Sequence, residues 1–254
     1  MKIFDTHAHY NDEAFDNDRD ALLSSMPENG IERIVEVGTS IEISKQAIEL
    51  AEKYEFIYAT VGIHPDVVNS YQISNIRDEL RVLARAPKVV AIGEIGLDYH
   101  YEGYDKTAQA EFFTAQLTLA RELSLPVCVH SRDAAEDTFR LLEPFGDCRI
   151  MLHCFSGSVE TAKIAAARGY YISVGGVLTF KNAKTLPQVV AAYPRELLLL
   201  ETDCPYLSPT PLRGTRNSSL NLPLVVEKLA EIWGVEAAVA AEATYANACG
   251  FYGL

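Results

Sequence analysis

The amino-acid sequence predicts a (β/α)8 TIM barrel with an additional helix at its C-terminal end. Eight short apolar runs alternate with longer amphipathic stretches, which is the pattern of strands and helices in a parallel α/β fold. The ends of consecutive runs lie about 20 to 35 residues apart, enough for one strand, one helix and two short loops. An open doubly wound sheet is the alternative, but the glycine-rich phosphate loop that normally follows its first strand is missing here.

The eight predicted strands are apolar along most of their length, as expected for a parallel sheet that is covered on both faces. Their polar residues fall mainly at the C-terminal ends. In a barrel, these ends form the rim on which catalytic groups are assembled. The strands span residues 2–9, 32–39, 56–64, 89–99, 126–132, 149–155, 170–176 and 197–203.

The stretches between the strands carry apolar residues at helical spacing. Ser158 is a favourable N-cap and Gly169 a favourable stop for one of these helices. An alanine-rich segment at the end of the chain supplies the additional helix. The predicted helices with assigned bounds are residues 18–26, 40–54, 105–123, 158–169, 222–233 and 236–248.

Length and composition predict a single globular domain spanning residues 1–254. Apolar residues make up 48% of the chain, and the formal net charge is −13, which disfavours non-specific binding along nucleic acid. We expect a cytoplasmic protein without membrane contact or an obligate protein partner. No apolar run is long enough to span a bilayer, the first ten residues are too polar for a signal peptide, and the five cysteines form no Cys-x-x-Cys pair.

Histidines and carboxylates gather at the predicted rim. Five of the six histidines end predicted strands, Glu94 and Asp98 lie late in the fourth strand, and Asp203 ends the eighth. Imidazole and carboxylate groups together suit a divalent metal ion. The five histidines are His7, His9, His64, His130 and His153.

Three of these residues, a histidine pair and a glutamate, predict metal binding most directly. His7 and His9 are two residues apart on one strand, so their side chains point to the same side. Glu94 stands in an apolar run between Gly93 and Gly96. An ionised carboxylate in that setting needs a partner, and its two oxygens can bridge two cations.

The rim motifs resemble those of the TatD-like metal-dependent hydrolases, usually described as TatD DNases, of the amidohydrolase superfamily. The resemblance extends over nearly the whole chain. After the eighth strand the family pattern Arg-Asn-Glu-Pro is replaced by Arg216-Asn217-Ser218-Ser219. The matching motifs are Phe4-Asp5-Thr6-His7-Ala8-His9, Gly62-Ile63-His64-Pro65, Gly93-Glu94-Ile95-Gly96-Leu97-Asp98-Tyr99, His130-Ser131-Arg132, His153-Cys154-Phe155-Ser156-Gly157 and Glu201-Thr202-Asp203-Cys204-Pro205-Tyr206-Leu207.

The resemblance implies a two-metal site, with Glu94 as the ligand shared by both ions. Mg²⁺ or Mn²⁺ is the expected ion for activity, and His-rich ligation also suits Zn²⁺, Co²⁺ or Ni²⁺. Asp203 is expected to accept the proton of the attacking water. One ion takes His7, His9, Glu94 and Asp203, and the other takes Glu94, His130 and His153.

The expected activity is deoxyribonuclease action, as a 3′–5′ exonuclease on single-stranded or frayed DNA ends. The acidic chain favours ends and short strands over long duplex. Expected substrate-binding residues are His64, Arg132, Lys181, Arg213 and Arg216. Two alternatives stay open: hydrolysis of carboxyl ester, amide or small phosphoester substrates at the same site, and a barrel that binds without catalysis.

Overall fold

A computed structural model describes the whole chain, Met1 to Leu254. The strand order follows the chain from the first strand to the eighth, and the paired strands are parallel. This is the order of a (β/α)8 barrel and confirms the predicted fold class. The strands are β1 (Ile3–Ala8), β2 (Ile31–Glu36), β3 (Ile57–Val61), β4 (Val89–Asp98), β5 (Val127–Arg132), β6 (Ile150–Leu152), β7 (Tyr171–Val174) and β8 (Leu198–Leu200).

The chain divides into two compact units. The first unit comprises Met1–Glu36 and Cys154–Leu254, and the second comprises Val37–His153. The first therefore holds β1, β2, β7 and β8, and the second holds β3 to β6. The prediction that residues 1–254 form a single domain stays a prediction.

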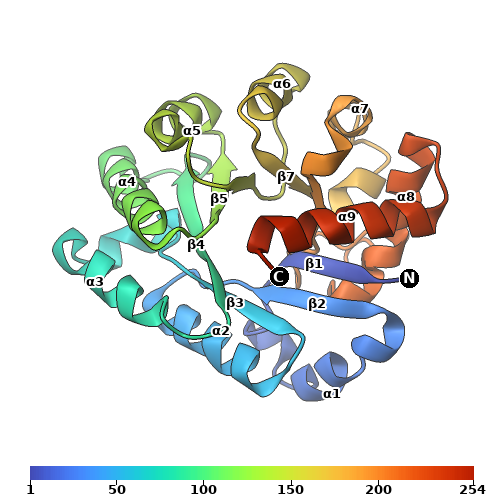
Figure 1. Cartoon of the computed structure of the whole chain (residues 1–254), viewed down its shortest axis with the longest axis horizontal. Coiled ribbons are helices and arrows are strands. Elements are labelled where there is room, and N and C mark those ends of the chain that lie inside the picture. The colour runs from blue at the N-terminus through green and yellow to red at the C-terminus, as the bar shows by residue number, and fades with distance from the viewer. The chain divides into compact units, whose positions relative to one another are not determined.

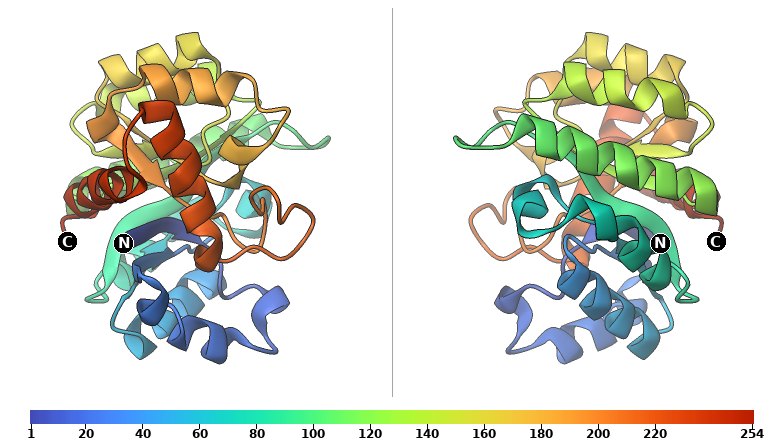
Figure 2. Two further views of the ribbon diagram at one scale, coloured as in Figure 1. Left: turned by 90° about the vertical axis from the view of Figure 1, so that its right-hand side faces the viewer. Right: turned by 90° about the vertical axis from the view of Figure 1, so that its left-hand side faces the viewer.

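In the second unit, β4 is the central element. All ten of its residues are buried, and it pairs with β3 on one side and β5 on the other. Figure 2 shows the connection from β4 to the next helix as a loop that extends away from both elements. The helices are α2 (Ile41–Lys53), α3 (Ile73–Leu83), α4 (Lys106–Leu123) and α5 (Ala135–Leu142).

Side-chain caps begin two of these helices. The hydroxyl of Ser40 accepts a hydrogen bond from the backbone N–H of Ile43 at the start of α2. The carboxylate of Asp105 accepts two backbone N–H groups at the start of α4. Each cap satisfies donors that a helix N-terminus otherwise leaves open.

In the first unit, β1 pairs with β2 and is linked to the chain after β8 by a bridge between Ala8 and Cys204. The predicted additional helix is α9, which runs along β1 (Figure 1). The hydroxyl of Tyr252 anchors it by donating to the backbone oxygen of Thr6, 2.9 Å away. The helices are α1 (Arg19–Ser24), α6 (Val159–Ala167), α7 (Thr185–Ala192), α8 (Leu222–Trp233) and α9 (Ala237–Tyr252).

Several element ends differ from the prediction. β6 and β8 are only three residues long, so His153 and Asp203 follow their strands instead of ending them. Cys154 and Asp203 adopt left-handed backbone conformations, with φ of 45° and 55°, which take the chain out of the extended ladder. Helices α3, α5 and α7 had no predicted bounds, and α9 continues past residue 248 to Tyr252.

No helix of the chain combines the length and the apolar character that a bilayer crossing requires. The cytoplasmic location stays a prediction.

Gly96 makes the close approach of β4 to β5 possible. Its φ is +149°, and a Cβ atom there would lie 1.9 Å from the backbone oxygen of His130. We expect Gly96→Ala to lower the free energy of unfolding by about 3 kcal/mol, because it combines backbone strain with a steric clash. Urea unfolding followed by circular dichroism measures the change.

Gly250→Ala is the matched control. Gly250 lies in α9. Apart from its two chain neighbours and the nearby backbone of its own helix, no atom stands within 4 Å of the position that an alanine methyl group would take. Alanine is the better helix former, so this variant is expected to be unchanged or up to about 1 kcal/mol more stable. Equal unfolding midpoints for the two variants would contradict the role given to Gly96.

Candidate metal centre

The first cluster consists of His7, His9 and Asp203 in the first unit. The Nε2 atoms of the two histidines lie 3.1 Å apart. Oδ1 of Asp203 is 3.7 Å from Nε2 of His7 and 3.4 Å from Nε2 of His9. His7 is fully buried, whereas the side chains of His9 and Asp203 keep 13% and 19% of their surface exposed. The cluster is therefore closed off on the side of His7 and accessible to solvent on the side of His9 and Asp203.

Backbone hydrogen bonds between β1 and the segment after β8 hold the first cluster in place. The N–H of Asp203 donates to the backbone oxygen of His7 at 3.0 Å, and the N–H of His9 donates to the oxygen of Cys204 at 2.9 Å. These bonds align three side chains that come from opposite ends of the sequence. The predicted gathering of these residues is therefore present within the unit.

A buried carboxylate beneath the first cluster was given no role from the sequence. Asp5 is fully buried, and its carboxylate accepts hydrogen bonds from the hydroxyls of Thr202 and Ser219, both at 2.6 Å. Burial raises the pKa of Asp5 to about 6, although these hydrogen bonds oppose the shift. Ser219 also makes two hydrogen-bonding contacts with Tyr10. Their hydroxyl oxygens lie 2.8 Å apart, and the backbone N–H of Ser219 donates to the phenolic oxygen.

This network ties the loop after β8 to β1, two residues before His7. A proline at position 219 would have no N–H and no hydroxyl with which to make these contacts. Ser219 therefore links the loop after β8 to Tyr10 through its backbone N–H and to Asp5 through its hydroxyl. The position of Asp5 inside an apolar strand was the available signal for it.

Glu36 is a second buried carboxylate that sequence reasoning missed. It ends β2 and accepts the backbone N–H groups of Tyr10 at 2.9 Å and Asn11 at 2.8 Å. These contacts fix the turn that follows His9. Burial raises the pKa of Glu36 to about 7, and the two backbone hydrogen bonds only partly offset it.

The second cluster consists of Glu94, His130, His153 and His64 in the second unit. Oε1 of Glu94 lies 2.7 Å from Nδ1 of His130 and 2.7 Å from Nε2 of His153. Nε2 of His64 is 3.5 Å from the same oxygen. The Glu94 side chain is 4% exposed. One buried carboxylate oxygen thus serves three imidazoles that come from different strand ends.

Asp98 holds His130 from the other side. Its Oδ2 lies 3.1 Å from Nε2 of His130, and its Oδ1 accepts the backbone N–H of His100 at 2.9 Å. Burial lowers the pKa of the His130 imidazole, but the carboxylates of Asp98 and Glu94 outweigh burial and leave that pKa raised. The surroundings of this ring therefore favour positive charge. The sequence placed Asp98 at the rim without a role.

Both donor sets fit divalent cations. Imidazole nitrogen and carboxylate oxygen are the usual ligands for Zn²⁺, Mn²⁺, Co²⁺ and Ni²⁺. In the second cluster the ligand atoms of His64, Glu94 and His130 all lie within 4.8 Å of one another, and the contacts of the first cluster are as close. The ligand atoms of each cluster are close enough to bind one ion together.

The predicted substrate-binding residues have different surroundings. His64 lies in the second cluster, and Arg132 ends β5, where its Nη1 donates to the hydroxyl of Tyr101 at 3.2 Å. Lys181 and Arg213 line one pocket of the first unit, formed by the loops after β7 and β8. Arg216 is engaged in a two-pronged ion pair with Asp18, at 2.7 and 2.6 Å, which gives it a structural contact. The substrate roles of these residues stay predictions.

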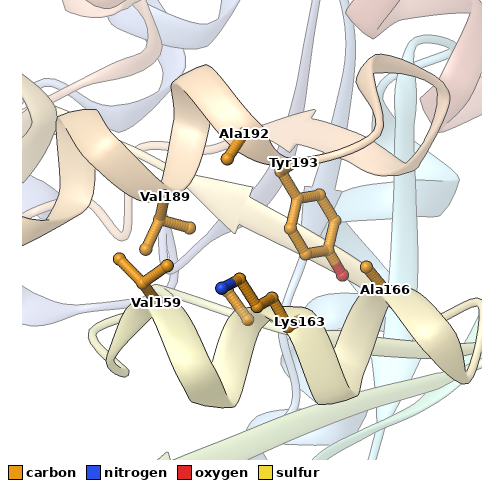
Figure 3. A pocket seen from close by; sticks show the side chains of 7 residues that line it. Val159, Lys163, Ala166, Val189, Ala192 and Tyr193 are labelled. Carbon is orange, nitrogen blue, oxygen red and sulfur yellow. The ribbon is translucent and has the colours of Figure 1, made fainter.

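A separate pocket lies between α6 and α7 (Figure 3). Valine side chains of both helices line it, together with Lys163 and Tyr193. It contains no carboxylate and no imidazole. Its lining therefore offers no metal-binding chemistry, and the two clusters remain the candidate site.

Comparisons with known proteins agree with this chemistry. The family model described as "TatD related DNase" matches residues 4–253. The chain is 42% identical to the uncharacterized metal-dependent hydrolase YabD of Bacillus subtilis (strain 168), over 91% of each chain. It is 34% identical to the 3'-5' ssDNA/RNA exonuclease TatD of Escherichia coli (strain K12), over 99% of each. The crystal structure of YJJV, a TatD homolog from Escherichia coli K12, has a TM-score of 0.93 and 30% identity, covering 99% of this chain and 98% of that one.

The buried carboxylate of Glu36 predicts a pH dependence of stability. Its pKa rises from 4.5 to about 7 on folding, so between these values the folded state binds more protons than the unfolded state. Stability contributed by this group therefore falls as pH rises from about 4.5 to 7. From pH 5 to 7, we expect the unfolding free energy of the metal-free wild-type protein to fall by about 2 kcal/mol more than that of the Glu36→Gln variant. Urea unfolding at several pH values measures this, and parallel profiles would contradict it.

Ser219→Ala tests the network at Asp5. The substitution removes a donor to a buried carboxylate and a partner of Tyr10, so we expect a loss of about 1 to 3 kcal/mol in unfolding free energy. Ser218→Ala is the matched control, because that side chain makes no capping hydrogen bond. Chemical unfolding of both variants measures the difference. A Ser219→Ala variant as stable as Ser218→Ala would show that the network contributes nothing to stability.

Proposed function

The chain belongs to the TatD related DNase family of metal-dependent hydrolases, and on that premise we propose that it removes nucleotides from the 3′ ends of single-stranded DNA. The relative from Escherichia coli that is named a 3'-5' ssDNA/RNA exonuclease is similar over 99% of both chains. The observation that carries the proposal is the buried Glu94 carboxylate, whose Oε1 lies 2.7 Å from each of two imidazoles. Such a donor set suits a metal-dependent hydrolase.

The two clusters are proposed to act as one two-metal centre. Both consist of residues at or just after the C-terminal ends of strands, and in (β/α)8 enzymes that end carries the active site. Glu94 would be the shared ligand. One ion would be held by His7, His9, Glu94 and Asp203, and the other by Glu94, His130 and His153.

Divalent ions, with Mg²⁺ or Mn²⁺ proposed for activity, would polarise the scissile phosphate and make the attacking water more acidic when bound. Asp203 is the proposed proton acceptor, because its carboxylate is the more exposed member of the first cluster and a carboxylate is a suitable general base. His7, beneath it, is held by the backbone contact with Asp203. The first cluster thus combines a buried, fixed imidazole of His7 with the partly exposed carboxylate of Asp203.

Cationic side chains of the rim loops are proposed to hold the phosphates of the DNA. Lys181 and Arg213 share one pocket in the first unit, and the guanidinium of Arg213 lies 3.8 Å from the centre of the Phe180 ring. Phosphate contacts from lysine and arginine position a nucleic acid without reading its sequence. His64, beside Glu94, is the proposed contact nearest the reacting phosphate.

An end-labelled substrate tests both activity and direction. We expect the protein, stripped with chelator and reloaded with Mg²⁺ or Mn²⁺, to convert 5′-labelled single-stranded DNA into a ladder of shortened labelled products. Removing a general base typically lowers a rate by about 10² to 10⁴-fold, so Asp203→Asn is expected to be at least 100-fold slower. Denaturing gels resolve the products.

Glu28→Gln is the control, because Glu28 is an exposed carboxylate of the first unit, outside both clusters. Release of labelled mononucleotide without a ladder would contradict the proposed direction. Intact DNA, combined with turnover of carboxyl ester, amide or small phosphoester substrates, would replace the nuclease proposal with the alternative hydrolase activity.

A further inference from the structure

An exposed aromatic ring stands beside a cation in the loop between β4 and α4. Tyr101 is among the most exposed large hydrophobic residues of the protein, at 59%. The guanidinium of Arg132 lies 5.1 Å from its ring centre and donates to its hydroxyl at 3.2 Å. His100 packs its edge against the same ring, 5.0 Å away at 82°. The ring is thus held in place while much of its surface faces solvent.

The other tyrosines of this segment are engaged differently. Tyr99 and Tyr104 stack on each other, 4.7 Å apart at 13°, and the Tyr99 hydroxyl donates to Asp137 at 3.1 Å. The stack covers one face of each ring, although Tyr104 is itself 42% exposed. Tyr101 is the most exposed tyrosine of the group, and the permanent cation of Arg132 lies beside its ring. An exposed aromatic ring offers a face on which a nucleic-acid base can stack.

Short connections join Tyr101 and Arg132 to the second cluster. Asp98, which holds His130, also accepts the backbone N–H of His100. The backbone N–H of Tyr99 donates to the oxygen of Arg132 at 2.9 Å. Asp98 and Arg132 are direct partners in the pairing of β4 with β5. The aromatic ring and its cation are therefore fixed to the same two strand ends that carry the candidate metal ligands.

We propose that Tyr101, Arg132 and His100 form a nucleotide platform, on which Tyr101 stacks against one base of the DNA end and Arg132 contacts an adjacent phosphate. A ring with a neighbouring guanidinium matches the two parts of a nucleotide, because every base has a stacking face and every linkage has an anionic phosphate. The platform rests on the proposed nuclease function and deepens it. It gives the second unit a means of preferring nucleic acid over small phosphoesters.

Removing a base from the substrate tests the platform. The substrates are single-stranded oligonucleotides carrying one abasic nucleotide at each of the last four 3′ positions in turn, compared with the unmodified strand. Stacking of one base on an aromatic side chain corresponds to about a 5- to 150-fold effect. For the wild-type enzyme, we expect one abasic position to lower kcat/KM by tenfold or more. In Tyr101→Leu the penalty at that position is expected to fall to near one, and in Tyr101→Phe it is expected to persist.

Tyr104→Leu is the matched control, because it removes an aromatic ring from the same loop that packs on Tyr99. It is expected to keep the abasic penalty. An abasic penalty of equal size in the wild type and in Tyr101→Leu would overturn the platform, as would the absence of any penalty in the wild type. Failure of the wild type to shorten the unmodified strand would instead contradict the nuclease function itself, and the platform's proposed ligand with it.

Discussion

The burial of the Glu94 carboxylate is the constraint on which the second unit depends. An ionised carboxylate in an apolar strand is strongly unfavourable unless charge or hydrogen bonds compensate it. Here Glu94 stands on a strand whose ten residues are all buried. The imidazoles of His130 on β5 and of His153 just after β6 approach one of its oxygens. The close packing of Gly96 on β5 allows that approach. The pairing of β4 with β5 therefore also brings the imidazole of His130 to the carboxylate of Glu94.

The first unit also contains a buried carboxylate, that of Asp5, and hydrogen bonds compensate its burial. Asp5 is fully buried beneath His7, and the hydroxyls that compensate it come from the segments after β8. The same segments present Asp203 to His7 and His9. The buried polar network thus makes the position of the loop after β8 depend on β1, so the carboxylate and the imidazoles of the first cluster are positioned together.

The sequence predicted the fold class, the order of the strands and the gathering of histidines, because strand alternation and apolar runs are local properties. It did not predict the compensating partners. Thr202 and Ser219 stand 197 and 214 positions from Asp5, and no local pattern connects residues so far apart. Arg216 shows the same limit: its ion pair with Asp18 spans 198 positions. A basic residue after a strand indicates charge near the rim, but three-dimensional packing decides which group that charge meets.

We propose that Glu94 belongs to a two-metal centre together with His7, His9 and Asp203. Anomalous diffraction from crystals of the Mn²⁺-loaded protein tests it most directly. We expect two manganese peaks per chain, one beside His7 and His9 and one beside His130 and His153, with Glu94 in contact with both. A single peak, or two peaks of which Glu94 contacts only one, would contradict the shared carboxylate.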